Sequence, residues 1–100
     1  MPSAPSPDLP TLDRPILLYK TRACPYCVAA GRFLRETKRV PEHLIGEIDL
    51  TFDDAARVAL ARASGQRTVP QIWIGGTHIG GYDDLRELDR RGGLDPLLPR

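Results

Sequence analysis

The chain has 100 residues, which is the size of one small domain with a modest core. Its 14 lysine and arginine residues outnumber its 13 aspartate and glutamate residues by one, and a net charge of +1 argues against a dedicated nucleic-acid binder. Two cysteines are too few for the disulfide framework of a small secreted protein, and no apolar run reaches the roughly 18 residues of a membrane span.

The N-terminal residues 1–13 are rich in proline and serine and poor in large apolar side chains. Such a segment buries too little surface to offset the entropy lost on ordering, so we expect a flexible tail followed by one domain over residues 14–100. The segment has neither the basic start and apolar core of a signal peptide nor the arginines of a transit peptide. The cytoplasm is therefore the expected compartment.

The two cysteines lie between an expected strand and an expected helix. Residues 15–20 contain an apolar run that fits a central buried strand, and apolar residues recur at helical spacing over residues 25–38 until Pro41 forbids continuation. Cys24 then falls at the helix N-cap and Pro25 at the first helical position. A Cys-x-x-Cys pair at such a junction predicts a dithiol that makes and breaks a disulfide.

The helix start predicts different roles for the two sulfurs. Unpaired backbone N–H groups and the positive end of the helix dipole stabilise a thiolate at Cys24, which lowers its pKa below that of a free thiol. Cys27 lies one turn further along, close enough to close the ring but poorly placed for the same stabilisation. We therefore expect Cys24 to attack a substrate disulfide and Cys27 to resolve the adduct.

Basic residues surround the cysteine pair in the sequence. Residues 14–35 contain five of them and no acidic residue, a local positive field that favours a thiolate and attracts an anionic thiol substrate. We assign Lys20 and Arg22, which flank the pair, to function, and Arg32 and Arg35 to a solvated basic face.

The second half of the chain alternates strands and helices. The sequence around Thr51, with Asp54 three places later, resembles a capped helix start, and glycines punctuate the later elements. The expected elements are a strand over 44–49, a helix over 53–63, a strand over 69–74, a Gly-Gly turn at 75–76, a strand over 77–79, a helix over 82–90 and a short turn over 94–98.

This order requires a parallel first pair of strands with a right-handed crossover, to which the late hairpin adds antiparallel partners. The expected fold is α/β, with a central mixed four-stranded sheet flanked by three or more helices. Within it, Tyr19 and Trp73 are expected in the core or at its edge. His43 and His78 have no metal-ligand spacing with the cysteines and are expected to be structural, and a zinc site would need four ligands.

Three motifs on this topology resemble the small bacterial dithiol type of glutaredoxin, which has a thioredoxin-like fold. They are Cys24-Pro25-Tyr26-Cys27, Thr68-Val69-Pro70 and Gly80-Gly81-Tyr82-Asp83-Asp84. The resemblance extends over residues 15–98 and includes the C-terminal residues 94–98. It implies a disulfide oxidoreductase that reduces protein disulfides and glutathione mixed disulfides, uses glutathione as reducing co-substrate and needs no tightly bound cofactor.

The resemblance also implies a glutathione site. The Pro70 peptide bond would be cis, so that Val69 pairs with the extended glutathione backbone. Lys20, helped by Gln66 or Arg67, would meet the glycine carboxylate, and the helix start after Gly81 would meet the γ-glutamyl end. For Asp83 and Asp84 the alternative is ordinary helix capping, and for Gly80 and Gly81 it is a plain turn. The implied binding residues are Lys20, Tyr26, Arg67, Thr68, Val69, Pro70, Gly81, Tyr82, Asp83 and Asp84.

The expected partners are glutathione and disulfide-containing or glutathionylated proteins. The protein is expected to be a monomer that binds neither nucleic acid nor membranes. Two alternatives stay open at this point. One is a thioredoxin-like donor recharged directly by a flavin reductase. The other is a glutaredoxin-like protein in which two copies hold an iron–sulfur cluster through Cys24 and glutathione. Tyr82 stands where some relatives carry an additional cysteine, so no third redox thiol is expected.

Overall fold

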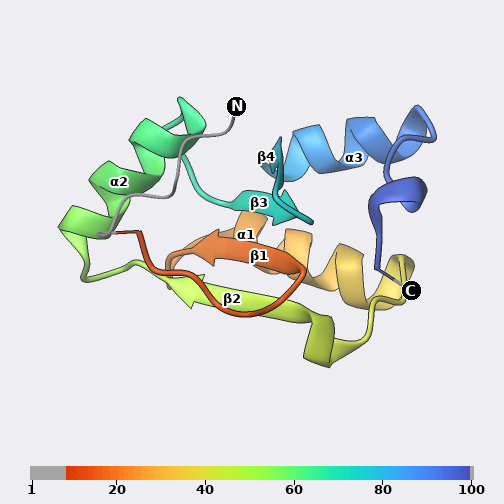
Figure 1. The fold of residues 1–100 in the computed structure, drawn as a ribbon, viewed down its shortest axis with the longest axis horizontal. Helices are drawn as coiled ribbons and strands as arrows, with labels where there is room; N and C mark the ends of the chain where they lie inside the picture. Colours follow the sequence, from red (N-terminus) through yellow and green to blue (C-terminus); the bar gives the residue numbers. More distant parts are fainter. Residues whose placement is uncertain (1–8, 100) are drawn as a thin grey trace.

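A computed structural model describes residues 9–99. Its four strands form one mixed sheet in the order β2-β1-β3-β4 (Figure 1). The first two strands are parallel, β3 runs antiparallel to β1, and β4 runs antiparallel to β3. The strands are β1 (Ile16–Lys20), β2 (Ile45–Asp49), β3 (Gln71–Ile74) and β4 (Thr77–Gly80). The sheet therefore confirms the expected mixed topology.

Three α-helices cover the two faces of this sheet: α1 (Pro25–Arg32), α2 (Asp54–Ser64) and α3 (Tyr82–Arg90). The alternation of side chains along β1 divides the core between the faces. Ile16 and Leu18 pack with residues of α1 and α3, whereas Leu17 and Tyr19 belong to the cluster that includes α2. In Figure 1, α1 accordingly passes behind β1, and α2 lies apart from α1 and α3.

The first helix is not a continuous α-helix to residue 38. It ends at Arg32 and continues as a π-helical turn, Phe33–Thr37, in which the Lys38 N–H donates to the Phe33 carbonyl at 3.0 Å. Phe33 and Leu34 are buried in the core, as the apolar spacing predicts. A π-turn adds one residue to the hydrogen-bonded ring, and apolar spacing alone does not distinguish it from an α-turn.

The cap of α2 also differs from the prediction. Asp53 is the N-cap, and its carboxylate accepts a hydrogen bond from the Ala56 N–H at 3.0 Å. The Thr51 hydroxyl instead accepts from the Arg22 N–H at 2.8 Å and binds Asp49. Thr51 therefore ties the loop before α2 to the turn before α1.

The chain before residue 14 is not a bare tail throughout. Leu9 is only 8% exposed and packs in the cluster of Tyr19 and α2, and the Tyr19 hydroxyl donates to the Pro10 carbonyl at 2.8 Å. Leu9 departs from the flexible tail expected over residues 1–13, because one apolar side chain in a proline-rich segment covers the edge of a cluster. Residues 1–8 of the predicted tail lie outside the described residues.

The start of β3 and the bounds of the last turn differ slightly from the predicted ones. The strand expected over 69–74 begins at Gln71, and the last turn is a short 3-10 helix, Asp95–Leu97, whose neighbours Leu94 and Leu98 are buried. Pro70 has no N–H to donate to a sheet ladder, which is why the pairing starts after it. Within residues 9–99 no helix is long and apolar enough to cross a membrane.

Candidate active site

The cysteine pair lies where the sequence predicts, at the junction of β1 and α1. Cys24 is the N-cap with extended backbone (φ −134°), and Pro25 is the first residue of the helix. The Cys24 sulfur accepts a hydrogen bond from the Cys27 N–H at 3.1 Å. The two cysteines are joined in a disulfide with their Cα atoms 5.2 Å apart. The first turn of the helix thus directs the Cys27 N–H, which has no partner within the helix, at the sulfur of Cys24.

The two sulfurs differ in access. Cys27 is buried, with 2% of its surface exposed, whereas Cys24 is partly exposed at the surface. Of the two sulfurs, that of Cys24 is therefore the more accessible from solvent. The roles of nucleophile and resolving thiol stay a prediction, which this difference in access favours.

The segment before β3 lies against the same sulfur. The Val69–Pro70 peptide bond is cis, as the resemblance implies, and the Val69 carbonyl oxygen lies 3.8 Å from the Cys24 sulfur. Pro70 is buried, Val69 is partly buried and Thr68 is exposed. The second motif therefore places one solvent-accessible stretch of backbone beside the reactive cysteine.

Acidic residues of β2 lie beside the basic residues that flank the cysteines. Lys20 lies 3.1 Å from a Glu47 carboxylate oxygen, and Arg22 lies 3.6 Å from Asp49 and stacks over the Phe52 ring at 4.9 Å. Burial would raise the pKa of Glu47, but hydrogen bonds from Lys20 and Arg35 outweigh it and hold that pKa below its usual value. The positive field expected from residues 14–35 is therefore partly neutralised.

The two arginines assigned to a solvated face behave differently. Arg32 fits that description, since it is exposed and pairs with Glu36 one turn away. Arg35 is only 27% exposed and binds two carboxylates, Glu42 and Glu47. The expectation was wrong for Arg35, because β2 and the turn before it bring acidic groups from another part of the chain.

The third motif forms the start of α3. Gly81 is the N-cap, and its N–H donates to the Asp84 carboxylate at 2.9 Å, so Asp84 has the capping role expected of one of the two acids. Asp83 is exposed. Gly80 has a positive φ of 111°, and a Cβ there would collide with the Asp84 side chain. A glycine at this position is thus required by the turn itself.

Two tyrosines connect the first motif to the third. The rings of Tyr26 and Tyr82 have centroids 6.3 Å apart, and 64% of Tyr26 is exposed. The Arg86 guanidinium holds the Tyr82 hydroxyl with a hydrogen bond of 2.9 Å. Together the two rings form an aromatic wall beside the cysteine pair.

Sequence reasoning missed the buried Gln71. Its side-chain amide donates to Gln66 and to the Thr68 carbonyl, both at 2.9 Å, and its oxygen lies 2.7 Å from Nε2 of His78. Because both amide hydrogens are used in this way, His78 is the donor to the oxygen. Burial lowers the pKa of His78, although Asp84 opposes this. A polar residue inside an apolar strand was the available signal, and Gln71 anchors the loop that precedes Val69.

His78 and Trp73 have structural roles, as expected. Trp73 packs edge-on against Tyr19 at 5.4 Å and against the His78 ring at 4.5 Å. No group of three or more potential metal ligands occurs in the part of the chain that the structure describes.

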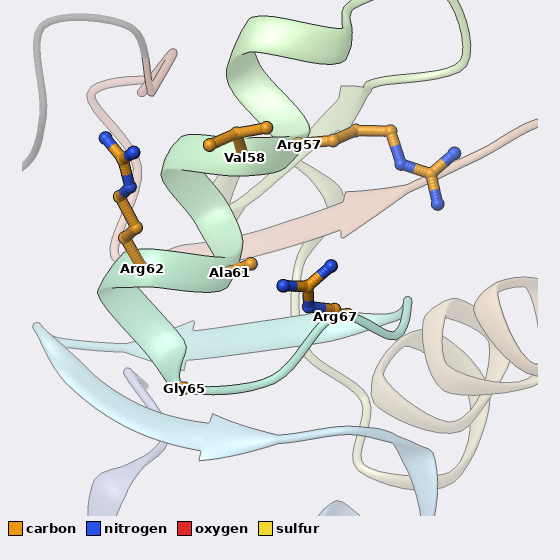
Figure 2. Close-up of a pocket in the computed structure, with 6 residues that line it drawn as sticks. All are labelled: Arg57, Val58, Ala61, Arg62, Gly65 and Arg67. Carbon is orange, nitrogen blue, oxygen red and sulfur yellow. The ribbon is translucent and has the colours of Figure 1, made fainter.

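A surface hollow of about 510 Å³ lies between α2 and the loop that follows it (Figure 2). Sequence reasoning singled out only Arg67 of its lining and missed the arginines of α2. The arginine hollow, as we call it, is lined by Arg57, Val58, Ala61, Arg62, Gly65 and Arg67.

Comparison with known proteins identifies close relatives. The family model for Glutaredoxin matches residues 16–79. The chain is 48% identical over 84 residues to a glutaredoxin of Pseudomonas aeruginosa, covering 84% of this chain and 95% of that protein. It is 46% identical over 81 residues to glutaredoxin 3 of Escherichia coli K12, covering 81% and 93%.

Solved structures agree with these relatives. A glutaredoxin from Brucella melitensis matches with a TM-score of 0.70 and 38% identity over 85% of this chain and 88% of that chain. A buckwheat glutaredoxin in complex with glutathione matches with a TM-score of 0.74 and 37% identity over 84% and 76%.

Proposed function

Since the chain belongs to the glutaredoxin family and is therefore a thiol-disulfide oxidoreductase, we propose that it reduces protein disulfides and glutathione mixed disulfides at the expense of glutathione. The observation that carries the proposal is the asymmetric cysteine pair. Cys24 is partly exposed at a helix start beside the Val69 backbone, and Cys27 is buried behind it.

The reaction with a disulfide substrate takes two exchanges. The Cys24 thiolate attacks one substrate sulfur, the substrate S–S bond breaks, and the other substrate sulfur leaves and takes a proton. Cys27 then loses its proton and attacks the Cys24 sulfur, which releases the second substrate thiol and forms the Cys24–Cys27 disulfide present in the structure. Two electrons pass from the enzyme to the substrate; one of the two protons comes from Cys27 and the other from solvent, which had taken the proton of Cys24.

Glutathione restores the dithiol by the reverse chemistry. One glutathione thiolate attacks Cys24 and frees Cys27, and a second attacks the resulting mixed disulfide, so two glutathione molecules become one glutathione disulfide. A glutathione mixed disulfide as substrate leaves the same adduct on Cys24, which a second glutathione resolves without Cys27.

The surroundings of Cys24 support its role as nucleophile. The Cys27 N–H donates to its sulfur, and the start of α1 places positive dipole charge there. Lys20 and Arg22 add positive charge, which Glu47 and Asp49 reduce. Both the helix start and the partly neutralised basic residues would therefore favour a thiolate at Cys24.

We assign the glutathione site to the three motifs. The backbone of Thr68 and Val69 would pair with the extended tripeptide beside Pro70. Lys20 would bind the glycine carboxylate, helped by Arg67 or by the side-chain N–H groups of Gln66, whose oxygen accepts from Gln71.

At the other end, the N–H groups of Tyr82 and Asp83 would receive the γ-glutamyl carboxylate. Asp84 would face the ammonium group while it caps the helix after Gly81. Tyr26 and Tyr82 would line the groove between the two ends. The similar buckwheat glutaredoxin, whose structure is a glutathione complex, supports this assignment.

We further propose that the protein acts as a cytoplasmic monomer, with glutathione as a co-substrate and no tightly bound cofactor. Its folded domain would begin no later than Leu9, which packs in the core. Its remaining partners would be disulfide-containing or glutathionylated proteins.

The test is turnover of a small glutathione mixed disulfide with two recycling systems. Glutathione with glutathione reductase should support turnover, and thioredoxin reductase without glutathione should not. Cys24→Ser should abolish turnover, because Cys27 is buried and the sequence contains no other thiol. Equal rates with both systems, or a tenth of the wild-type rate in Cys24→Ser, would exclude the proposed function.

A further inference from the structure

The arginine hollow carries positive charge without acidic partners. Residues 57–67 contain three arginines and no aspartate or glutamate. Within residues 9–99, none of Arg57, Arg62 and Arg67 forms an ion pair, whereas Lys20 and Arg90 each have a carboxylate within 4 Å. Arg14, Arg39 and Arg86 also have no ion pair there, but they do not share a hollow. The hollow is thus a place where the fold leaves several guanidinium groups unneutralised.

The hollow combines this charge with an apolar floor. Figure 2 shows Arg57 and Arg62 leaving α2 in opposite directions, with Arg67 rising from the loop below the helix. Val58 is 51% exposed, and Ala61 and Gly65 complete the lining. Guanidinium groups bind carboxylates in a bidentate manner, and the floor accommodates an apolar side chain between them.

The hollow borders the loop that leads to the candidate active site. Arg67 is two residues before Val69, whose carbonyl lies 3.8 Å from the Cys24 sulfur. A chain seated against α2 can therefore extend along this loop to the reactive cysteine. The volume of about 510 Å³ exceeds what one carboxylate requires.

We propose that the arginine hollow is a docking site for an acidic segment of a protein substrate, which it holds while the substrate disulfide reacts at Cys24. The proposal rests on the proposed function. An acidic peptide fits better than a nucleic acid, because the lining contains no aromatic ring on which a base would stack. Docking of this kind would raise the rate of encounter more than it alters the chemistry.

The test compares two peptides that each carry one intramolecular disulfide. The first has glutamates on one side of the disulfide, and the second has glutamine at each of those positions. Pre-reduced enzyme is mixed with either peptide in single turnover, and the peptide dithiol formed is separated and measured. The enzyme supplies both electrons and ends as the Cys24–Cys27 disulfide, and the protons come from Cys27 and solvent, so glutathione is not required.

Arg62→Glu is the informative variant, because Arg62 is exposed and has no place in the assigned glutathione site. We expect the second-order rate constant for the acidic peptide to fall about fivefold or more, with the rate for the glutamine peptide unchanged. Arg62→Gln should show a smaller loss. Added salt should lower the wild-type rate with the acidic peptide and have little effect on the Arg62→Glu rate.

Arg90→Glu is the matched control. Like Arg62, Arg90 lies in the last turn of a helix, but that helix is α3 and Arg90 does not line the hollow. It should leave both peptide rates unchanged, and melting curves should show all variants folded. Equal rates for the two peptides with the wild type, or an equal loss in Arg62→Glu and Arg90→Glu, would overturn the docking proposal. The proposed function is tested separately by glutathione-coupled turnover of the small mixed disulfide, which Arg62→Glu should not affect.

Discussion

The ammonium group of Lys20 lies 3.1 Å from a carboxylate oxygen of Glu47 on the neighbouring strand. Glu47 is also bound by Arg35, so one acid is shared by two cations. If Lys20 binds the glycine carboxylate of glutathione, that carboxylate has to compete with Glu47. The strength of glutathione binding then depends on a residue that does not touch glutathione.

Glu47→Gln is therefore expected to strengthen glutathione use. Removing the competing charge should lower the KM for glutathione by up to about fivefold, since partly exposed ion pairs contribute about 0.2–1 kcal/mol. The rate of Cys24 alkylation should change less. Glu42→Gln is the control, because Glu42 binds Arg35 without contacting Lys20. A KM that is unchanged in Glu47→Gln, or lowered equally in Glu42→Gln, would show that Glu47 does not compete with glutathione for Lys20.

The same carboxylate predicts a dependence of stability on acid. Hydrogen bonds from Lys20 and Arg35 outweigh burial and lower the pKa of Glu47 in the folded protein. A lowered folded-state pKa stabilises the fold above the ordinary carboxyl pKa, and this stabilisation is lost as the pH falls through the folded value. Urea unfolding should show the wild type more stable than Glu47→Gln at pH 7, with a difference that shrinks in acid. A stability difference between the two proteins that stays constant with pH would contradict the stabilisation of the Glu47 carboxylate by Lys20 and Arg35.

Leu9 provides a test of the segment before the sheet. Leu9→Ala should lower the free energy of unfolding by about 2 kcal/mol, the low end for a buried leucine, because the site lies at the edge of its cluster. Leu12→Ala, at a position 48% exposed, should have little effect. Equal melting temperatures for the two variants would show that Leu9 does not dock in solution.

Gln71 predicts a coupling between the buried amide and the candidate glutathione site. Gln71→Met removes the hydrogen bonds that hold Gln66 and Thr68, and leaves His78 without its acceptor. We expect a loss of about 1–3 kcal/mol in stability and a higher KM for glutathione, with Cys24 alkylation unchanged. Gln66→Ala, which removes one of these bonds, should have a smaller effect on both. A stability loss with no change in KM would make Gln71 purely structural.

Local patterns predicted the parts of the site that depend on neighbouring residues. The position of Cys24 at the N-cap followed from an apolar strand, a proline and a helical repeat in succession. The bounds of α3 at Tyr82 and Arg90 followed from glycines at both ends and acids in the first turn. Such signals act within a few residues and are visible in the sequence.

Contacts between distant parts of the chain were not predictable in the same way. The parallel register of β1 and β2 sets Leu18 opposite Glu47 and Lys20 opposite Asp49, which reduces a positive field that a count along the sequence overestimates. The packing of Leu9 similarly depends on how α2 packs against the sheet, because Leu9 belongs to the cluster that α2 and the sheet form together. These features follow from tertiary structure and not from local composition.

We propose that Cys24 attacks and Cys27 only resolves, and a side-by-side measurement with Cys27→Ser tests this division of roles. A small glutathione mixed disulfide and a disulfide-bonded protein are reduced by the same enzyme stock, with glutathione and glutathione reductase. A second glutathione clears the small adduct, whereas a bulky protein adduct needs Cys27, one helical turn away and at high effective concentration. Cys27→Ser should keep most of its activity on the mixed disulfide, or exceed the wild type, and lose most of its activity on the protein disulfide. A parallel loss of both activities would contradict the account, because it would mean that Cys27 is needed for the nucleophile itself.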